Sequence, residues 1–378
     1  MRIAVLNMTG GGFSGGYKRY ISSILPRIAS RPETVEILCA SPASLGVETW
    51  LAGTPKIKFV GCEPFRFMRH VPDAGLMACL DGFCPDLVFI TLERYIKYRD
   101  VPVVTVVHNM GPLSGVKVSS GILDKAKCLA QLLETQIAVK NSTAVIAPTD
   151  HVRDFLIKNW SLGNDNVTTI NFGTSHMPKD ARLPTGLAAP GRFIFTAGSL
   201  EVYRGLDDLI KAMPRLADSF PGLKLLVAGG TRSATVGYLR NLKKLAFGLG
   251  VAGDIVWLGN LPEEELAWCY RNCAAFVMTS RVESFGFVAL EAMQNGCGCV
   301  STNSPCLPEI FRNCALYYSP GDIAGLLQVV SEALNRNMGE CERFGSMGRE
   351  RASGFSWDKA AEQTMEVLLK AAGKRQGG

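Results

Sequence analysis

Short apolar runs alternate with amphipathic segments from one end of the chain to the other. The amphipathic segments, such as 206–216 and 323–334, repeat their apolar residues with the period of an α-helix. Several short runs are apolar at every position, as is typical of parallel β-strands covered on both faces. The strands predicted in this way lie near residues 3–6, 35–39, 87–90, 103–107, 144–147, 167–170, 193–196, 223–228, 255–258, 274–278 and 298–301.

This alternation predicts an α/β protein with two doubly wound, Rossmann-like domains. The stretch 174–191 is rich in proline, glycine and small residues, and it is the predicted linker between an N-terminal domain, 1–173, and a C-terminal domain, 192–355. The segment 356–378 predicts a further helix, which can pack back on the N-terminal domain, and a tail. A ligand shared by the two domains would occupy a cleft lined by the carboxyl-end loops of both sheets.

Composition and charge narrow the class of protein. Of the 378 residues, 47% are hydrophobic and 20% are charged, which indicates a globular chain. The net charge of +6 is modest and dispersed, so we expect no nucleic-acid partner. The apolar run within 1–7 is too short for an export signal, and no window is long enough for a membrane span. We therefore predict a cytoplasmic protein, with the inner face of the membrane as an alternative.

The twelve cysteines do not form a metal-binding pattern. They are scattered, mostly in apolar surroundings, and are predicted to be reduced core thiols. The pairs Cys269/Cys273 and Cys297/Cys299 each lack the second pair that a zinc site would need. No metal site is predicted.

A glycine-rich loop follows the first predicted strand. It contains Gly10-x-Gly12-x-x-Gly15, the spacing of a dinucleotide-binding fingerprint. A nicotinamide-dependent dehydrogenase also needs an acidic residue at the end of the second strand, and that place is taken by Cys39-Ala-Ser41. A Walker A loop is excluded because Tyr17 separates Gly16 from Lys18. Two interpretations stay open: a loop that admits a phosphate or an acceptor, and a tight turn that needs glycine.

A second candidate site lies around Glu283, Gly286 and Glu291. The pattern predicts a strand at 274–278, a turn, and then a helix, whose first amides attract a diphosphate or sugar hydroxyls. Gly286 lets a ligand approach the backbone, while Glu283 precedes the helix and Glu291 lies about two turns inside it. The alternative is that Glu283 caps the helix and Glu291 is a solvated acid.

With these motifs in view, the chain resembles the family-4 retaining glycosyltransferases of the two-domain GT-B fold over nearly its whole length. The resemblance is strongest in 279–293, which matches the E-x7-E signature of the family. Further matching pieces are Gly15-Gly16, His108, Ile146-Ala-Pro-Thr-Asp150, Gly198 to Gly205 with Arg204-Gly205, Ala228-Gly-Gly230, Leu258-Gly259 and Pro308-Glu309.

The resemblance implies transfer of a sugar, with retention, from a nucleoside diphosphate sugar to a glycan or lipid-linked acceptor, without metal or cofactor. It makes Glu283 and His108 the catalytic residues, with Glu283 on the donor sugar. It assigns donor binding to Gly15 and Gly16, to Ser199, to Arg204 at the diphosphate, to Leu258 at the base, to Phe285, Gly286, Phe287 and Val288 around sugar and phosphate, and to Glu291 at the ribose.

The sequence departs from the family pattern at Ser199, where the family usually has an arginine. A charged contact to phosphate contributes about 1.5–3 kcal/mol, so we hypothesise that Arg281 or Arg232 replaces it; alternatively, both are surface arginines. Asn109 also stands where the family often has aspartate. Two other functions stay open: a nucleotide-binding pseudo-transferase, suggested by Ser199, and a dehydrogenase.

The segment Phe65-Arg-Phe-Met-Arg-His-Val71 alternates aromatic and basic residues, and Lys117, Lys125 and Lys127 add charge. Such a face can rest on anionic lipid and admit a lipid-linked acceptor. The alternative is an ordinary solvated surface.

Overall fold

The computed structural model describes residues 1–9, 15–115, 122–174, 178–188, 190–231 and 235–373, and it divides the chain into two compact units. The first unit comprises the described residues up to 113, from 122 to 173 and from 356 onwards. The second comprises the described residues from 174 to 355 together with 114 and 115. The predicted glycines Gly10 and Gly12, together with Lys117 and Arg232, lie outside the described residues.

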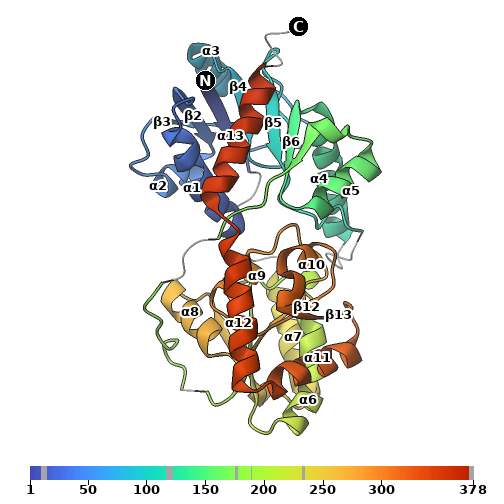
Figure 1. Ribbon diagram of the computed structural model, residues 1–378. Coiled ribbons are helices and arrows are strands. Elements are labelled where there is room, and N and C mark those ends of the chain that lie inside the picture. The colour runs from blue at the N-terminus through green and yellow to red at the C-terminus, as the bar shows by residue number, and fades with distance from the viewer. Residues whose placement is uncertain (10–14, 116–121, 175–177, 189, 232–234, 374–378) are drawn as a thin grey trace. The chain divides into compact units, whose positions relative to one another are not determined.

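The first unit is built on a seven-stranded parallel sheet of order β3-β2-β1-β4-β5-β6-β7 (Figure 1). Its interior strand β1 is almost wholly buried because Ile3, Ala4, Val5 and Leu6 all have zero exposure. The strands are β1 Arg2–Leu6, β2 Glu36–Ser41, β3 Ile57–Gly61, β4 Leu87–Ile90, β5 Val103–Val106, β6 Ala144–Ala147 and β7 Val167–Thr169.

Helices cover this sheet, and one of them comes from the far end of the chain. Helix α13 packs along α1, as the red and blue ribbons of Figure 1 show. The Arg27 Nε atom donates to Asp358 Oδ1 at 2.7 Å between these helices. The helices are α1 Gly15–Ser30, α2 Val47–Trp50, α3 Ala74–Phe83, α4 Ile122–Asn141, α5 Asp150–Trp160 and α13 Trp357–Gly373, with short 3-10 turns η1 Ala43–Leu45 and η2 Asn164–Asn166.

The second unit repeats the design with a six-stranded parallel sheet of order β10-β9-β8-β11-β12-β13. Its strands are β8 Phe193–Ala197, β9 Lys224–Ala228, β10 Ile255–Gly259, β11 Ala275–Met278, β12 Cys299–Thr302 and β13 Ala315–Tyr318. Its helices are α6 Leu206–Ser219, α7 Val236–Gly248, α8 Glu263–Asn272, α9 Phe287–Gln294, α10 Cys306–Phe311, α11 Ile323–Asn335 and α12 Met338–Ser353, with 3-10 turns η3 Val202–Arg204, η5 Ala252–Asp254 and η6 Arg312–Cys314.

Both sheets confirm the predicted doubly wound α/β class. Strand order reverses between β1 and β4 in the first unit and between β8 and β11 in the second. In open α/β sheets such switch points form a crevice at the carboxyl ends of the strands, where ligands bind. Each unit therefore has one edge at which a site is expected.

Two strands, β3 and β13, were not predicted from the apolar pattern. Both are edge strands of their sheets, and each carries several partly or fully exposed residues. Edge strands contact solvent on one side, so they do not need the continuous apolar run that marks a central parallel strand.

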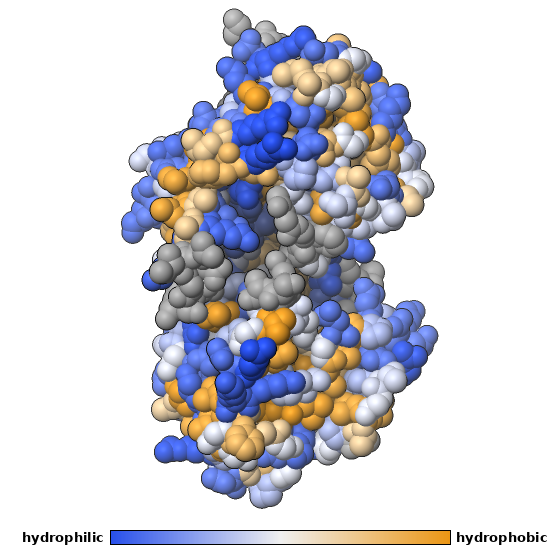
Figure 2. Space-filling model, turned by 180° about the vertical axis from the view of Figure 1, so that it is seen from behind, coloured by the Kyte–Doolittle hydropathy of each residue, from blue (hydrophilic) through white to orange (hydrophobic). Residues whose placement is uncertain are grey.

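Hydrophilic and hydrophobic residues are interspersed on the face drawn in Figure 2. Among the described residues, no helix is both long enough and apolar enough to cross a membrane.

Candidate functional site

In the second unit, the candidate site begins at the loop between β11 and α9. Gly286 is the N-cap of α9 and has a φ of 91°, a left-handed conformation that L side chains rarely adopt. A Cβ atom there would also lie 3.3 Å from Leu307 Cδ2. Glycine is therefore required, and it brings the first turn of α9 to the carboxyl edge of the sheet.

The aromatic and aliphatic residues around Gly286 have different surroundings. Phe285 is buried, with its ring edge-on to Phe287 at 5.2 Å and to Phe355 at 5.9 Å. Phe287 and Val288 are partly exposed in the first turn of α9. The side chain of Phe285 thus packs in the core and supports the turn, so any ligand contact from this residue would come from its backbone.

Glu283 forms an ion pair with Arg204. The Glu283 side chain is 9% exposed, and Arg204 Nη1 donates to its Oε1 atom and also lies 3.3 Å from Ser280 Oγ. Desolvation lowers the pKa of Arg204, but the neighbouring Glu283 carboxylate raises it, and the pKa ends above its ordinary value. The guanidinium is therefore charged. The alternative that Glu283 caps α9 is wrong, because Gly286 occupies the cap.

Arg204 reaches this pair from the 3-10 turn η3, which follows β8. Its guanidinium lies across Gly198, where an added Cβ atom would be 3.6 Å from Arg204 Cζ. Ser199, the next residue, is partly exposed and lines a narrow cavity with Arg204 and Thr279. The structure thus brings Ser199, Arg204 and Glu283 together at the switch point between β8 and β11.

Glu291 is buried, with 7% exposure, and its Oε2 atom accepts a hydrogen bond from the Tyr270 hydroxyl at 2.9 Å. The alternative of a solvated helical acid is therefore wrong. Glu291 is also the fifth residue of α9, so it lies just over one turn from the helix start instead of two. The partner Tyr270 comes from α8 and was not predicted, because no local sequence signal links it to Glu291.

Leu258 lies near the end of the edge strand β10. The parallel register steps from Trp257↔Val227 to Gly259↔Ala228, so Leu258 is the extra residue of a bulge. Bulges redirect the backbone and often occur at binding sites. This geometry suits recognition through the main chain at Leu258.

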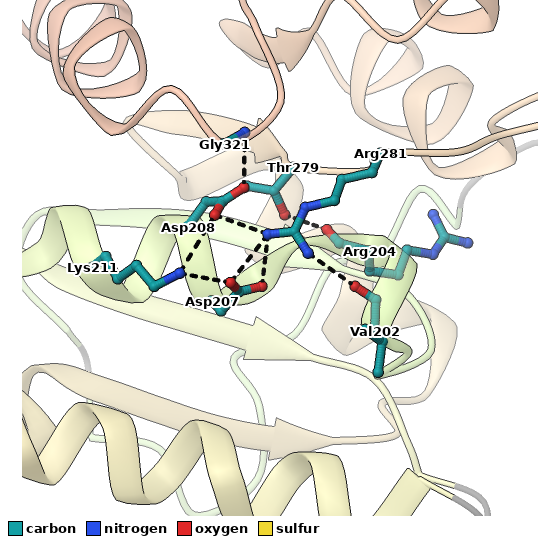
Figure 3. Close-up of polar contacts among 8 residues, drawn as sticks. All are labelled: Val202, Arg204, Asp207, Asp208, Lys211, Thr279, Arg281 and Gly321. Carbon is teal, nitrogen blue, oxygen red and sulfur yellow. Dashed lines mark hydrogen bonds and ion pairs between the residues drawn. The ribbon is translucent and has the colours of Figure 1, made fainter. Parts of the chain in front are cut away.

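The structure argues against Arg281 as the replacement for the missing arginine. Its Nη2 atom contacts Asp207 Oδ1 and Oδ2, both at 3.0 Å, and Asp208 Oδ1 at 2.9 Å. Figure 3 shows the guanidinium of Arg281 turned towards these two carboxylates, whereas that of Arg204 points away from them. The Arg281 side chain is therefore held against α6 by both carboxylates. The other candidate, Arg232, is not described.

In the first unit, His108 lies just past the end of β5, among aromatic rings. Its ring centroid is 4.7 Å from Tyr20, 5.2 Å from Phe172 and 5.9 Å from Tyr17. Desolvation in these surroundings lowers the pKa of His108 to about 3. The imidazole is therefore neutral at physiological pH, and it is suited to hydrogen bonding and not to neutralising phosphate.

The backbone at His108 is held by Glu93, a residue that the sequence did not single out. Glu93 Oε1 accepts hydrogen bonds from the His108 amide and, at 2.6 Å, from the Asn109 amide. Burial raises the pKa of Glu93, an effect that these hydrogen bonds to the carboxylate oppose. Glu93 follows β4, which lies beside β5 in the sheet. From sequence, this contact with His108 could have been predicted only from the expected pairing of these two strands.

The start of α1 is anchored at the same edge. Tyr17 Oη donates to Asn7 Oδ1 at 2.9 Å and lies 3.0 Å from Thr91 Oγ1, so the residue that excluded a Walker A loop links β1 and β4. Gly15 begins α1, and an added Cβ atom there would meet nothing within 4 Å. Gly16 follows it. A ligand could therefore approach the backbone closely here, and no described atom prevents a side chain at position 15.

The cysteines are all free thiols. Cys273 Sγ and Cys297 Sγ lie 3.9 Å apart, and burial raises the pKa of Cys297 well above its ordinary value. Among the described residues, no three His, Cys, Asp or Glu side chains gather in a way that could hold a metal ion.

Comparison with known families covers most of the chain in two parts. Residues 180–351 match the family model described as Glycosyl transferases group 1, and residues 14–175 match the one described as Glycosyltransferase Family 4.

Individual relatives and solved structures agree with these matches. A D-inositol 3-phosphate glycosyltransferase of Streptomyces bingchenggensis is 27% identical over 97% of this chain and 87% of its own. A glycogen synthase of Mycobacterium tuberculosis is 29% identical over 74% of this chain and 66% of its own. The fold is shared with sucrose-phosphate synthase of Thermosynechococcus elongatus (TM-score 0.76, 18% identity, 98% of both chains) and with Anabaena HepE in complex with UDP-glucose (TM-score 0.73, 18% identity, 98% of this chain and 100% of that one).

Proposed function

Because the chain belongs to the glycosyltransferases that these two family models describe, we propose that it moves a hexose, with retention, from a nucleoside diphosphate sugar to a glycan or lipid-linked acceptor. The observation that carries the proposal is the Arg204–Glu283 pair beside the first turn of α9. The donor has a diphosphate next to a sugar. The cation of the pair can contact the diphosphate, and the anion beside it can contact the sugar.

The proposed chemistry follows from how charge develops. Breaking the bond between the anomeric carbon and the diphosphate places negative charge on phosphate and positive character on the sugar ring. Fixed groups of opposite charge stabilise that state most when they are in place beforehand. In our proposal Arg204 and the amides of the first turn of α9 contact the diphosphate, and Glu283 contacts the sugar. The sequence has no Asp-x-Asp pair, so these groups carry the charge without a metal ion.

The nucleoside end of the donor is assigned to Glu291 and Leu258. Glu291 is held at one oxygen by Tyr270, which orients the carboxylate for the ribose hydroxyls. The bulge at Leu258 offers backbone groups for the base. HepE, which shares the fold, has been solved with UDP and with UDP-glucose, and uridine diphosphate is therefore the first nucleotide to test here.

Retention is proposed to occur by front-face attack, in which the departing phosphate accepts the proton of the acceptor hydroxyl. The oxygen of that hydroxyl bonds to the anomeric carbon as the bond to phosphate breaks. The neutral His108 is assigned a hydrogen bond to the donor sugar, and Gly15 and Gly16 a close backbone approach.

A thermal-shift screen of nucleotide sugars tests the proposal. A ligand that binds the folded state raises the melting temperature by mass action, so the largest rise identifies base and sugar together. Transfer or hydrolysis of that donor, lost in Glu283→Gln, is the expected result. Binding without turnover would favour the pseudo-transferase suggested by Ser199, and a nicotinamide absorbance change would favour a dehydrogenase.

A basic and apolar face of the first unit favours a lipid-linked acceptor. The loop 65–71 is fixed to α4, because Glu134 accepts from the Met68 amide at 2.6 Å and lies 3.0 Å from His70 Nε2. Exposed apolar side chains of the loop and of α4 share this region with Arg66, Arg69, Lys125 and Lys127. The apolar ones are Phe67 (53% exposed), Met68 (59%), Val71 (54%), Leu129 (57%) and Leu133 (42%).

We propose that this face rests on an anionic bilayer, because apolar side chains insert at the headgroup level while lysine and arginine contact anionic lipid. Co-sedimentation with vesicles of phosphatidylcholine, with and without phosphatidylglycerol, tests it. Binding should need the anionic lipid and should fall in Phe67→Ser. Phe247→Ser is the matched control, because Phe247 is 80% exposed on α7 in the other unit. Equal sedimentation with both lipid mixtures would exclude the proposed contact with anionic lipid.

A further inference from the structure

We propose that Arg281 is a positioning residue that fixes the 3-10 turn η3 and thereby places Arg204 for the diphosphate. The inference rests on the proposed function, because it gives Arg204 the role of contacting the donor. It also explains why an arginine that does not face the site lies two residues before Glu283.

Three consecutive carbonyl groups of η3 accept hydrogen bonds from the loop after β11. The Val202 carbonyl accepts from Arg281 Nη1 at 3.4 Å, and the Tyr203 carbonyl accepts from the Arg281 amide at 2.8 Å. The Arg204 carbonyl accepts from Thr279 Oγ1 at 2.6 Å. Two of these three bonds come from Arg281. The backbone that carries the Arg204 side chain is thus tied to the loop that carries Glu283.

The tie needs a close approach of the two segments, and Gly205 permits it. Gly205 ends η3 with a φ of 63°, and an added Cβ atom would lie 2.5 Å from the Thr279 carbonyl oxygen and 3.3 Å from Arg281 Nε. Any other residue would push η3 away from the loop. The glycine after Arg204 therefore serves the contact with Arg281 and Thr279, in addition to the turn itself.

The far end of Arg281 is anchored on α6. Its Nη2 atom binds Asp207 and Asp208, and the buried Asp208 also accepts from the Gly321 amide at 3.2 Å. Lys211 Nζ lies 2.8 Å from Asp207 Oδ2. Desolvation raises the pKa of Asp207, but hydrogen bonds from Lys211 and Arg281 outweigh it, and the pKa is lowered overall.

Two cations and two carboxylates gather in this cluster, and both carboxylates hold Arg281 there. Figure 3 shows the division: the Arg281 guanidinium lies between the two carboxylates and the Val202 carbonyl, and the Arg204 guanidinium extends in the opposite direction. Lysine could not make all of these contacts, because one ammonium group lacks the planar fork that reaches a carboxylate and a carbonyl at once.

A double-mutant cycle on nucleoside diphosphate affinity tests the inference. UDP, GDP and ADP are titrated calorimetrically, and the tightest is used with the wild type, Arg281→Lys, Arg204→Gln and the double variant. Residues that act through one another are non-additive. Introduced into the wild-type protein, Arg281→Lys should weaken nucleotide binding about 10-fold. Introduced into the Arg204→Gln variant, it should weaken binding by less than about 2-fold. Equal weakening in both backgrounds would overturn the proposal, because a structural role alone gives additivity.

Lys211→Gln is the matched control. It removes a cation from the same acidic cluster without touching a carbonyl of η3, and it should leave the affinity unchanged. A loss equal to that of Arg281→Lys would show that the cluster, and not the tie to η3, is what matters, and would also overturn the proposal.

A second variant covers the case in which Arg281→Lys does not fold. Thr279→Val removes only the hydroxyl that donates to the Arg204 carbonyl, and the same cycle with Arg204→Gln should again be non-additive; additivity overturns the proposal. The two levels of inference fail differently. If the wild type binds none of the three diphosphates, the proposed function fails; if it binds one and the cycle is additive, only the role of Arg281 fails.

Discussion

The carboxyl edges of the two sheets share one topology, but different kinds of side chain lie at them. At the first edge, the polar side chains of Asn7, Tyr17 and Thr91 bond to each other, and His108 is neutral. At the second edge, charges are paired: Arg204 with Glu283, and Arg281 with the acids of α6. The difference teaches that the fold supplies only the edge. The residues just past each strand decide whether ion pairs or uncharged polar side chains lie there.

The largest expected effect comes from removing charge at the second edge without changing shape. Glu283→Gln should lower kcat for sugar transfer by about 10²–10³-fold, because a fixed charge near the developing positive charge is lost. Affinity for the nucleoside diphosphate should rise, because the neutral side chain no longer competes with the phosphate for Arg204. Steady-state kinetics with the donor found by thermal shift measures this. A variant with near-normal kcat would contradict the assignment of Glu283 to the reacting sugar.

The next effect concerns the cation of the same pair. Arg204→Gln should weaken binding of the nucleoside diphosphate about 10- to 100-fold, since a hydrogen bond to a charged group contributes about 1.5–3 kcal/mol. Calorimetric titration measures it. Arg271→Gln is a control, because Arg271 bonds to backbone carbonyls of the second unit away from this pair. Unchanged affinity in Arg204→Gln would place the phosphate elsewhere.

The first edge can be tested by pH, because its histidine is kept neutral. The folded state lowers the pKa of His108 from 6.5 to about 3, so between these values the unfolded chain binds the extra proton and stability falls as the pH drops. On going from pH 7 to pH 5, His108→Gln should lose about 2 kcal/mol less stability than the wild type. Urea unfolding at both pH values measures this. Burial raises the pKa of Glu93, which acts in the opposite direction in both proteins.

Parallel pH dependence in the wild type and His108→Gln would contradict a neutral, desolvated His108. It would also remove the contrast between the two edges, because a charged histidine would make the first edge cationic.

The smallest effect is expected at the support of Glu291. Tyr270→Phe removes one buried hydrogen bond to a carboxylate, so affinity for the nucleoside diphosphate should fall about 3- to 10-fold while inorganic pyrophosphate binds as before. Tyr317→Phe, which loses a bond to the Arg312 carbonyl, is the control and should bind normally. Equal losses for the diphosphate and for pyrophosphate would mean that Glu291 does not act on the ribose.

The apolar pattern was sufficient for the fold class, because central parallel strands must be apolar on both faces. The apolar pattern did not predict β3 and β13, because the partly or fully exposed positions of these edge strands are occupied by polar residues such as Lys58 and Tyr317. The E-x7-E segment could be placed at the start of a helix because strand, glycine and helix follow one another along the chain. Local order of this kind is what a single sequence records.

The partners of the site residues were harder to predict. Tyr270 lies 21 residues from Glu291, and Glu93 lies 15 from His108, and only the packed sheet brings them together. The partners of Arg281 were hard to predict for the same reason. Its direction depends on where the acids of α6 lie, 73 and 74 residues earlier in the chain.

The ion pair between Arg204 and Glu283 also bears on product release. If the diphosphate binds Arg204 as proposed, it competes with Glu283 for the same guanidinium after the sugar has left, and the carboxylate is tethered beside it at a high effective concentration. In the proposed mechanism, re-forming the pair would displace the spent nucleotide and return the protein to its starting state. We expect an intact donor, which engages both partners at once, to be held better than the nucleotide that remains after transfer.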